Sequence, residues 1–306
     1  MYRIQLGKSD LQVPTIGVGC FRMSALSVKE AEAFIDKALE LEMNFFDHAD
    51  IYGGGECETL FAEAIGMNAT VREKVILQSK CGIVPGKRYD FSKDYILQSV
   101  DGILKRLNTD YLDVLLLHRP DALVEPEEVA EAFDALKISG KVRHFGMSNQ
   151  NTKQIQLLQK YVKQPIVANQ LQLSPTNATM IQQGLEVNMG SDGAVNRDGS
   201  ILDFCRLQDI TIQPWSPFQF GFMEGVYLDN EKFPELNRVI NTLAKQYKVT
   251  NIAIVVAWIL RHPARLQPIL GTMNKERLEE ASKACDIRLT RQEWYDIYLA
   301  AGHFLP

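Results

Sequence analysis

Long apolar runs, paired cysteines and an excess of basic residues are all missing from this sequence of 306 residues. Its longest apolar stretch, residues 252–260, is much shorter than the roughly 18 to 20 residues that a membrane-spanning helix needs. The first six residues contain no apolar signal-peptide core. The formal net charge is −5 and no basic stripe compensates it. The sequence therefore predicts neither a membrane span nor nucleic-acid binding.

Cysteine and histidine are scarce, which argues against disulfide and metal frameworks. The five cysteines, Cys20, Cys57, Cys81, Cys205 and Cys285, are odd in number and show no close pairing. This pattern is typical of free thiols in a reducing compartment, so we expect a cytoplasmic protein. The five histidines form no His-Glu-x-x-His motif, and no Cys-x-x-Cys motif or calcium-type carboxylate ladder occurs. No metal site is predicted.

The sequence does contain enough apolar material for a large core, since 46% of its residues are hydrophobic and 23% are charged. Short β-rich runs alternate with helical patterns along almost the whole chain. The eight predicted strands are residues 16–19, 45–47, 75–79, 112–118, 144–147, 166–169, 210–213 and 267–270. The predicted helices include residues 28–42, 57–65, 93–107, 126–139, 152–161, 235–247 and 275–284.

This alternation predicts the fold class. Strands that are apolar on both faces and separated by helices indicate a parallel sheet covered by helices. Eight of them suit a single α/β domain, a (β/α)8 TIM barrel over residues 1–306. The alternative is an open doubly wound sheet, but Gly17 and Gly19 lack the third glycine of a dinucleotide-binding fingerprint. Residues 2–13 predict an N-terminal β-hairpin that closes the bottom of the barrel.

Polar side chains stand where three of the predicted strands end. Asp47, Lys80 and His118 each end or follow a strand, and Tyr52 comes five residues after Asp47. An α/β barrel keeps its active site at this edge of the sheet. A lysine about 4 Å from a tyrosine, at an effective dielectric of about 20, would lower the tyrosine pKa by roughly three units. We therefore predict that Lys80 lowers the Tyr52 pKa, that Asp47 keeps Lys80 charged, and that His118 directs a donor at the same reacting oxygen.

Each of these four residues has a structural explanation when it is taken alone. Tyr52 could be a half-buried rim aromatic, Lys80 a solvated strand end, His118 a core histidine, and Asp47 a cap before the glycine turn at residues 53–55. The four together, at neighbouring strand ends, favour an active site instead.

The sequence resembles the aldo-keto reductase family, most closely its bacterial YdhF-like oxidoreductases. The resemblance is carried by residues 44–53, 79–80, 116–121 and 140–149, with His48 where the family more often has threonine. It implies an oxidoreductase that uses NADPH to reduce small-molecule aldehydes and ketones to alcohols, with Tyr52 as the general acid. The alternative is an NADP(H)-binding sensor or regulatory subunit with little turnover. No oligomeric state is indicated.

The resemblance also implies a site for the nicotinamide end of the cofactor. Ser148, Asn149 and Gln170 would bind the carboxamide, and Trp215 would stack on the ring where the family usually has a tyrosine. The other residues that are expected along this part of the cofactor, up to the pyrophosphate, are Gly19, Ser216, Pro217 and Phe218.

The segment that follows the last strand predicts an anion site. It opens a helix, and the unpaired backbone amides of a helix N-terminus attract anions. The resemblance assigns this site to the adenosine 2′-phosphate of NADPH, with Glu280 at the adenine. The expected residues are Gly271, Thr272, Met273, Asn274, Lys275, Arg277 and Glu280. For Lys275 and Arg277 the alternative is a solvated charge pair on the helix.

The substrate end of the site is expected at Phe21, Arg22 and Arg119. The two arginines could receive an acidic substituent, but a pairing of Arg119 with Asp121 or Asp50 has equal weight. Further rim contributions are expected from Met23, from Phe220 within residues 219–223, and from the irregular segment 184–200.

Overall fold

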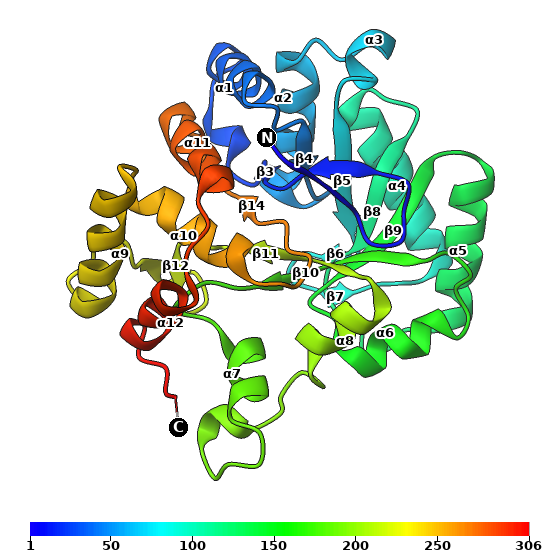
Figure 1. The fold of residues 1–306 in the computed structure, drawn as a ribbon. Coiled ribbons are helices and arrows are strands. Elements are labelled where there is room, and N and C mark those ends of the chain that lie inside the picture. The colour runs from blue at the N-terminus through cyan, green and yellow to red at the C-terminus, as the bar shows by residue number, and fades with distance from the viewer. Residues whose placement is uncertain (306) are drawn as a thin grey trace.

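Eight parallel strands form the central sheet, each overlapping a predicted one (Figure 1). The computed structural model describes residues 1–305. The strands are β3 (Gly17–Gly19), β4 (Phe45–Asp47), β5 (Ile76–Cys81), β8 (Leu112–Leu117), β9 (Val142–Ser148), β10 (Ile166–Gln172), β11 (Thr211–Trp215) and β14 (Ile269–Leu270). Their order is β11-β10-β9-β8-β5-β4-β3-β14, and a parallel bridge between Ile212 and Leu266 joins the two ends of the sheet. The sheet is therefore a barrel.

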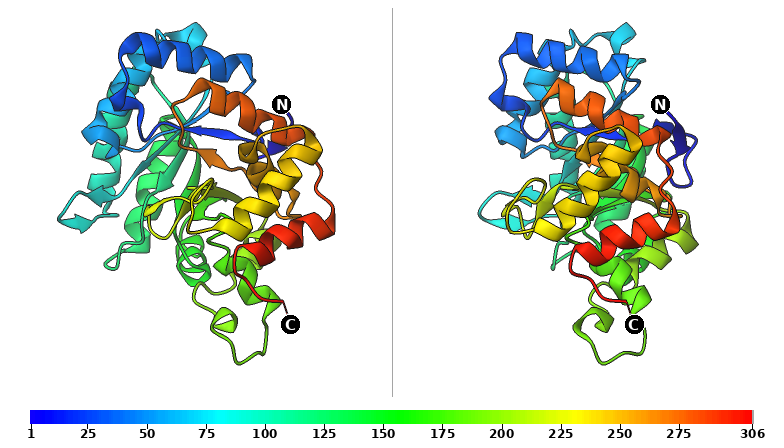
Figure 2. Two further views of the ribbon diagram at one scale, coloured as in Figure 1. Left: turned by 90° about the vertical axis from the view of Figure 1, so that its left-hand side faces the viewer. Right: turned by 60° about the vertical axis from the view of Figure 1, so that its left-hand side comes forward.

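Helices surround the barrel in all three ribbon views (Figures 1 and 2). The predicted helices are present as α1 (Val28–Glu40), α2 (Glu56–Ala64), α4 (Lys93–Leu107), α5 (Pro126–Ile138), α6 (Thr152–Gln159), α9 (Pro234–Tyr247) and α11 (Lys275–Ser282). Helices α3 (Ala69–Arg72), α7 (Thr179–Leu185), α8 (Ile201–Gln208), α10 (Asn251–Arg261) and α12 (Arg291–Ala300) are not among the predicted ones. Helix α10 is buried over residues 253–259, and a short continuous apolar run of this kind does not by itself distinguish a buried helix from a buried strand.

Two start signals fix where helices α1 and α5 begin. Ser27 Oγ accepts the Glu30 N–H at 3.4 Å, while Glu30 Oε2 accepts the Ser27 N–H at 2.8 Å. Pro126 occupies the first turn of α5, where its missing N–H costs nothing. Both helices follow loops that leave the carboxyl ends of strands β3 and β8. The caps thus define the ends of two loops that border the site described below.

The N-terminal hairpin closes one end of the barrel, as predicted. Strands β1 (Arg3–Gln5) and β2 (Gln12–Pro14) pair antiparallel, and Figure 1 shows them in dark blue across the strands. The Gly7 N–H donates to Thr211 Oγ1 at 2.8 Å, at the start of β11. Leu6 and Val13 reach into an inner core that includes Phe45. The hairpin therefore fills the amino-terminal end of the barrel and leaves the carboxyl ends open.

Two short hairpins follow strands at that open end. Strands β6 (Ile83–Val84) and β7 (Arg88–Tyr89) form one, and β12 (Gln219–Phe220) and β13 (Gly225–Val226) form the other. The segment predicted as irregular, residues 184–200, contains the last residues of α7 and a 3-10 turn at Asp192–Ala194. It extends away from the barrel in Figures 1 and 2.

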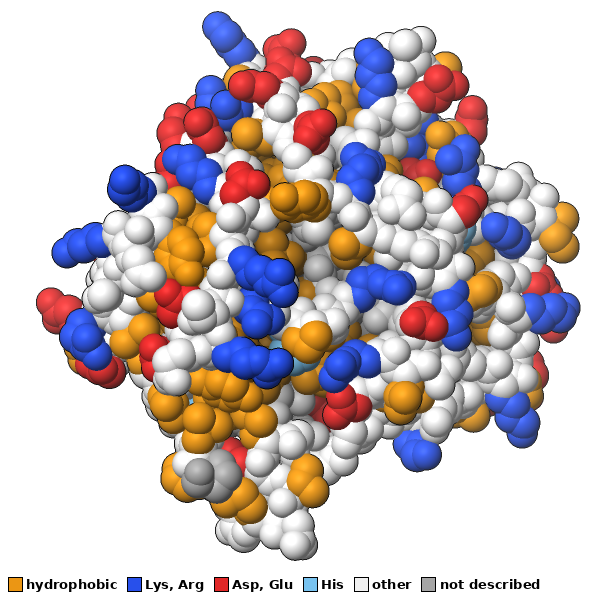
Figure 3. Space-filling view, viewed as in Figure 1, with side chains coloured by type: hydrophobic (Ala, Val, Ile, Leu, Met, Phe, Trp, Pro, Cys, Tyr) orange, Lys and Arg blue, Asp and Glu red, His pale blue; other side chains and the backbone are white. Residues whose placement is uncertain are grey.

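The face of the molecule that the N-terminal hairpin crosses carries a mixture of charged and apolar side chains. Lys, Arg, Asp and Glu side chains are interspersed with apolar ones across the face seen in Figure 3. Among residues 1–305, none of the helices combines the length and apolarity that crossing a bilayer requires. Nor do these residues bring together three histidine, cysteine or acidic side chains in a way that could hold a metal ion.

Candidate active site

The four residues predicted at the strand ends come together at the open end of the barrel. Asp47 ends β4, Lys80 lies in β5, and His118 follows β8. Tyr52 begins a short 3-10 helix after β4. The next residues include Gly53 and Gly54, which have φ values of 58° and 64°, a left-handed conformation that glycine adopts at little cost. This turn lets the chain reverse directly after the tyrosine.

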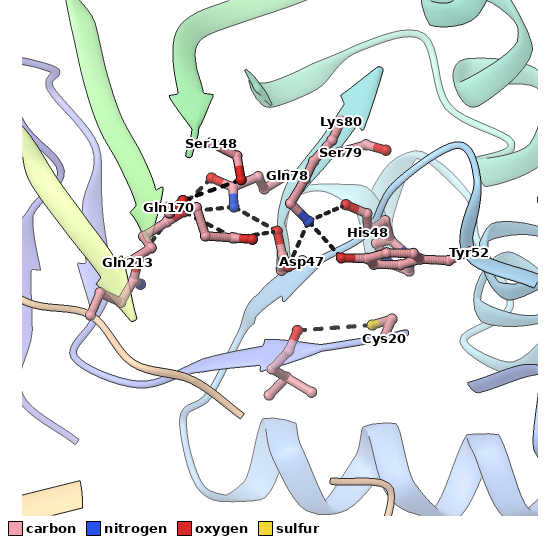
Figure 4. Close-up of polar contacts among 12 residues, drawn as sticks. Cys20, Asp47, His48, Tyr52, Gln78, Ser79, Lys80, Ser148, Gln170 and Gln213 are labelled. Carbon is pink, nitrogen blue, oxygen red and sulfur yellow. Dashed lines mark hydrogen bonds and ion pairs between the residues drawn. The ribbon is translucent and has the colours of Figure 1, made fainter. Parts of the chain in front are cut away.

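The Lys80 ammonium group links Asp47 to Tyr52 (Figure 4). Its Nζ donates to Asp47 Oδ2 at 2.8 Å, to the His48 carbonyl oxygen at 2.7 Å and to Tyr52 Oη at 3.1 Å. Lys80 is fully buried, and Asp47 is 2% exposed. An ammonium group has three protons, so these three acceptors use all of them. One of the three ammonium protons of Lys80 therefore points at the Tyr52 oxygen.

The charge state of Lys80 follows from its partners. Burial alone lowers the Lys80 pKa, but the Asp47 carboxylate and the Tyr52 hydroxyl together outweigh burial and raise the pKa above its usual value. Lys80 therefore stays charged at neutral pH, as predicted.

Lys80 lowers the Tyr52 pKa, as predicted, but the expected net lowering of that pKa is wrong. Burial raises the Tyr52 pKa, and this effect exceeds the lowering by Lys80, with Asp47 adding to the rise. The sequence-based argument counted the charge of Lys80 and not the loss of water around the phenol. Tyr52 is consequently protonated at neutral pH, which is the state that a proton donor needs.

His118 is a neutral imidazole beside the tyrosine. Burial, followed by the charges of Lys80 and Arg119, holds the His118 pKa well below its usual value. Its ring meets the Tyr52 ring edge-on, with 6.0 Å between centroids. His118 Nδ1 is buried and has no hydrogen-bond partner among residues 1–305. A neutral imidazole carries one N–H, so His118 can donate one hydrogen bond to a bound molecule.

A chain of buried glutamine amides, which the sequence analysis missed, supports Asp47 from inside the barrel (Figure 4). Gln78 Nε2 donates to Asp47 Oδ1 at 2.6 Å and to Gln213 Oε1 at 2.8 Å. Gln213 Nε2 donates back to Gln78 Oε1 at 3.1 Å and on to Gln267 Oε1 at 3.0 Å. Gln267 Nε2 reaches the Pro14 carbonyl oxygen at 2.8 Å. The chain thus connects the N-terminal hairpin to the Asp47 carboxylate.

One signal in the sequence could have identified these glutamines. Gln78, Gln213 and Gln267 each stand within or beside an apolar strand run, and each is 0% exposed. A buried amide without a partner costs about 1 to 3 kcal/mol, so three of them in barrel strands imply that they bond to one another or to the site.

The residues predicted at the nicotinamide end also lie close together. Ser148 Oγ donates to the Gln170 carbonyl oxygen at 3.2 Å, and Asn149 Nδ2 donates to Ser148 Oγ at 2.7 Å. Trp215 Nε1 donates to Asn149 Oδ1 at 3.2 Å. Gln170 Nε2 donates to Asp47 Oδ1 at 3.2 Å. These contacts join the amide-rich end of β9 and β10 to the Asp47 carboxylate.

One cavity of about 1040 Å³ connects Tyr52 and His118 with Arg277. Of the residues predicted to bind cofactor, those that line it are Gly19, Ser148, Asn149, Gln170, Trp215, Ser216, Pro217, Phe218, Gly271, Thr272, Met273, Asn274 and Arg277. Lys275 and Glu280 are not in the lining; Glu280 Oε1 instead accepts from Lys283 Nζ at 2.8 Å. Lining residues that the sequence analysis missed include Leu228 and Asp229, which follow strand β13, and Asn251 and Ile252 at the start of α10.

The far end of this cavity contains the start of helix α11. Asn274 caps the helix, since its Oδ1 accepts the Arg277 N–H at 2.8 Å, and Thr272 Oγ1 accepts the Asn274 N–H at 3.1 Å. Arg277 forms no ion pair within residues 1–305. The helix N-terminus and the guanidinium group together make this end of the cavity attractive to an anion.

The predicted substrate residues Phe21, Arg22 and Arg119 line the same cavity. The Phe21 ring meets the Tyr52 ring edge-on at 5.0 Å. Two rim expectations are wrong: Met23 is fully buried in the core between helices and barrel, and Phe220 packs against Phe233. Within the expected segment 219–223, Gln219 and Met223 do line the cavity, together with Val226, which was not expected. Residues 184–200, which were expected at the rim, are not in this lining.

Several proteins are similar in sequence over essentially the whole chain. The uncharacterized oxidoreductase YcsN of Bacillus subtilis is 36% identical over 100% of both chains. The oxidoreductase YdhF of Escherichia coli is 35% identical over 92% of this chain and 91% of its own. A 6-dehydroglucose reductase of Novosphingobium aromaticivorans is 32% identical over 99% of this chain and 96% of its own.

Solved structures share the fold. The thermostable aldo-keto reductase Tm1743, in complex with the inhibitor epalrestat, superimposes with a TM-score of 0.79 at 24% identity, covering 98% of this chain and 100% of that one. An aldo-keto reductase from Klebsiella pneumoniae in complex with NADPH gives a TM-score of 0.77 at 23% identity, covering 97% and 93%. Residues 15–298 match the model of the aldo/keto reductase family. The chain therefore belongs to the aldo/keto reductase family of oxidoreductases.

Proposed function

We propose that this protein reduces aldehydes or ketones to alcohols with NADPH, and that Tyr52 is the proton donor. The observation that carries the proposal is the contact between the charged Lys80 ammonium group and Tyr52 Oη, 3.1 Å long, at the wall of a large cavity. Reduction of a carbonyl group places negative charge on its oxygen, so a proton donor beside a fixed positive charge suits this chemistry.

The residues along the cavity fit NADPH. The amide and hydroxyl groups of Ser148, Asn149 and Gln170 line the cavity and can form hydrogen bonds with a carboxamide near Tyr52. At the opposite end, Arg277 and the α11 N-terminus suit the 2′-phosphate that distinguishes NADPH from NADH. When bound, NADPH would supply the hydride. The Klebsiella pneumoniae relative, whose structure contains NADPH, is consistent with this assignment.

Each member of the catalytic group then has a separate task. Tyr52 transfers its proton to the carbonyl oxygen, and Lys80 stabilises the resulting phenolate through the hydrogen bond that it already makes. Asp47 holds Lys80 charged and oriented. His118, which is neutral, donates a hydrogen bond to the carbonyl oxygen and orients it toward Tyr52.

The direct test is the rate of NADPH oxidation by the purified protein with aromatic, aliphatic, dicarbonyl and sugar-derived aldehydes, beside the same series with NADH. The sugar aldehydes belong in the series because one relative is a 6-dehydroglucose reductase. We expect turnover with NADPH that exceeds turnover with NADH. Tight NADPH binding without turnover of any carbonyl compound would contradict the proposal and would support a sensor or regulatory subunit.

A further inference from the structure

Arg119 stands at the mouth of the cavity without an acidic partner. It directly follows His118 and lines the same cavity as Tyr52. Its guanidinium carbon lies 5.8 Å from the Trp215 ring centroid and 5.8 Å from the Phe222 ring centroid. Within residues 1–305, the guanidinium group forms no ion pair and donates no hydrogen bond to another residue. All five of its N–H donors are therefore available to a ligand.

The two acidic residues that could have neutralised Arg119 are engaged elsewhere. Asp121 Oδ2 accepts the Phe91 N–H at 2.9 Å, and Asp121 Oδ1 accepts the Leu123 N–H at 2.9 Å. Asp50 forms no ion pair within residues 1–305, and its buried Oδ1 lacks a partner. Burial raises the Asp50 pKa to about 7. The pairings of Arg119 with Asp121 or Asp50 that the sequence left open are thus both absent.

The other charged residues of the cavity lining are bonded elsewhere or lie at its other end. Asp229 Oδ2 accepts a hydrogen bond from Asn251 Nδ2 at 3.0 Å. The Asp47 carboxylate is paired with Lys80. Arg22 Nη1 donates to the Gly271 carbonyl oxygen at 2.9 Å, which ties Arg22 to the loop that the proposed function gives to the cofactor. Arg277 belongs to the phosphate end of the same groove. Arg119 is the arginine of this lining that stands next to the catalytic histidine.

The surroundings of Arg119 suit an anion on a short apolar spacer. The Trp215 and Phe222 rings meet edge-on at 6.4 Å and leave apolar surface beside the guanidinium group. Phe222 is 68% exposed, so a ligand can reach this surface from solvent. Contact with two aromatic rings restricts the orientation of the planar guanidinium group. A guanidinium group in a fixed orientation can donate two parallel hydrogen bonds to a carboxylate.

We propose that Arg119 is a specificity-determining residue that binds a substrate carboxylate, so the preferred substrates are oxo acids whose carbonyl group is separated from the carboxylate by a short chain. This inference rests on the proposed function. The spacer lies against Trp215 and Phe222 while the carbonyl oxygen lies between Tyr52 and His118.

The test compares 4-oxobutanoate with its methyl ester, which has the same carbonyl group and no charge. We expect the wild-type protein to reduce the acid with a kcat/KM about 10- to 100-fold above that of the ester, mainly through a lower KM. In Arg119→Gln the ratio of the two kcat/KM values should fall to near one, and Arg119→Lys should give an intermediate ratio because it keeps the charge and loses the fork. The control Arg291→Gln removes an exposed arginine of α12 and should keep the wild-type ratio.

Three results would overturn the inference. The first is a wild-type preference for the ester, which needs no variant and so does not depend on how the variants fold. The second is an unchanged ratio in Arg119→Gln. The third is a fall in the acid-to-ester ratio in Arg22→Gln as large as the fall in Arg119→Gln. Such a result would attribute the preference for the acid to the overall positive charge at the cavity mouth. Turnover of the ester alone would leave the proposed function standing, whereas turnover of neither compound would count against that function itself.

A phosphorylated aldehyde, glyceraldehyde 3-phosphate, separates carboxylate recognition from recognition of any anion. We expect its kcat/KM to respond less to Arg119→Gln than that of 4-oxobutanoate. An equal or larger response would contradict the assignment of Arg119 to carboxylates.

Discussion

The catalytic centre and the cavity mouth differ in how firmly their side chains are held. At the centre, Lys80 and Asp47 are buried on strands, and every Lys80 donor has an acceptor. At the mouth, Phe21 is 45% exposed, Phe222 is 68% exposed, and Arg119 has no ion pair within residues 1–305. The barrel therefore fixes the chemistry, and the loops leave the choice of substrate open.

This difference separates two kinds of mutational effect. A change at the centre should lower kcat and the free energy of unfolding, because it leaves buried polar groups without partners. A change at the mouth or along the cofactor groove should mainly alter KM for one ligand, because those groups are exposed to water before the ligand binds. The following predictions run from the largest expected effect to the smallest.

Lys80→Met should have the largest effect. It leaves the Asp47 carboxylate buried without its charged partner, so we expect the free energy of unfolding to fall by about 3 to 5 kcal/mol. We also expect kcat to fall by at least about 10²-fold, because the proton donor loses its adjacent positive charge. Denaturant unfolding and steady-state kinetics measure the two effects. The double variant Lys80→Met with Asp47→Asn should regain part of the stability and none of the activity.

An unchanged free energy of unfolding in Lys80→Met would contradict the account of the centre. It would mean that the Asp47 carboxylate finds water or another donor, and so that the site is less rigid than its contacts indicate.

Gln78→Leu should have an intermediate effect. It removes a donor to Asp47 and leaves Gln213 Oε1 with only the longer hydrogen bond from Gln170 Nε2, at 3.4 Å, so we expect a loss of about 1 to 3 kcal/mol in the free energy of unfolding. Because Gln78 acts through Asp47, kcat should fall with little change in KM for NADPH. Gln292→Leu on the exposed face of α12 is the matched control and should leave both quantities near the wild-type values. Equal effects from both variants would argue against a positioning role for the amide chain.

Arg277→Gln should have the smallest effect and the most selective one. Arg277 lines the phosphate end of the cavity, so its loss should raise KM for NADPH by about 10-fold and leave KM for NADH nearly unchanged. Lys275→Gln is the comparison, because Lys275 starts the same helix and does not line the cavity. Both KM values come from initial rates at saturating carbonyl substrate. If Lys275→Gln matched Arg277→Gln, the helix charge as a whole would determine the preference.

Much of the fold could be predicted from the sequence, because each barrel strand is a short apolar run bounded by turn residues. The grouping of Asp47, Lys80 and His118 at the open end of the barrel could be predicted for the same reason, since they are polar residues at the ends of such runs. Helix α10 could not, because the continuous apolar run at residues 253–259 is compatible with a buried helix and with a buried strand.

Properties that depend on distant partners also escaped sequence reasoning. Gln78 and Gln213 are 135 positions apart, and only the closed barrel shows that their amides pair. The Tyr52 pKa was predicted in the wrong direction because the extent of its burial depends on the packing around the cavity. The isolation of Arg119 likewise depends on Asp121 binding two backbone amides instead.

The most direct test of the central claim is single-turnover oxidation of bound NADPH by wild-type protein and by Tyr52→Phe, with NADPH affinity measured in parallel. Removal of the hydroxyl should slow oxidation by roughly 10²- to 10⁴-fold, because the developing oxygen anion loses its proton donor. NADPH affinity should stay within about two-fold, since the cofactor contacts are elsewhere in the cavity. Oxidation at the wild-type rate in Tyr52→Phe would contradict the claim that Tyr52 is the proton donor.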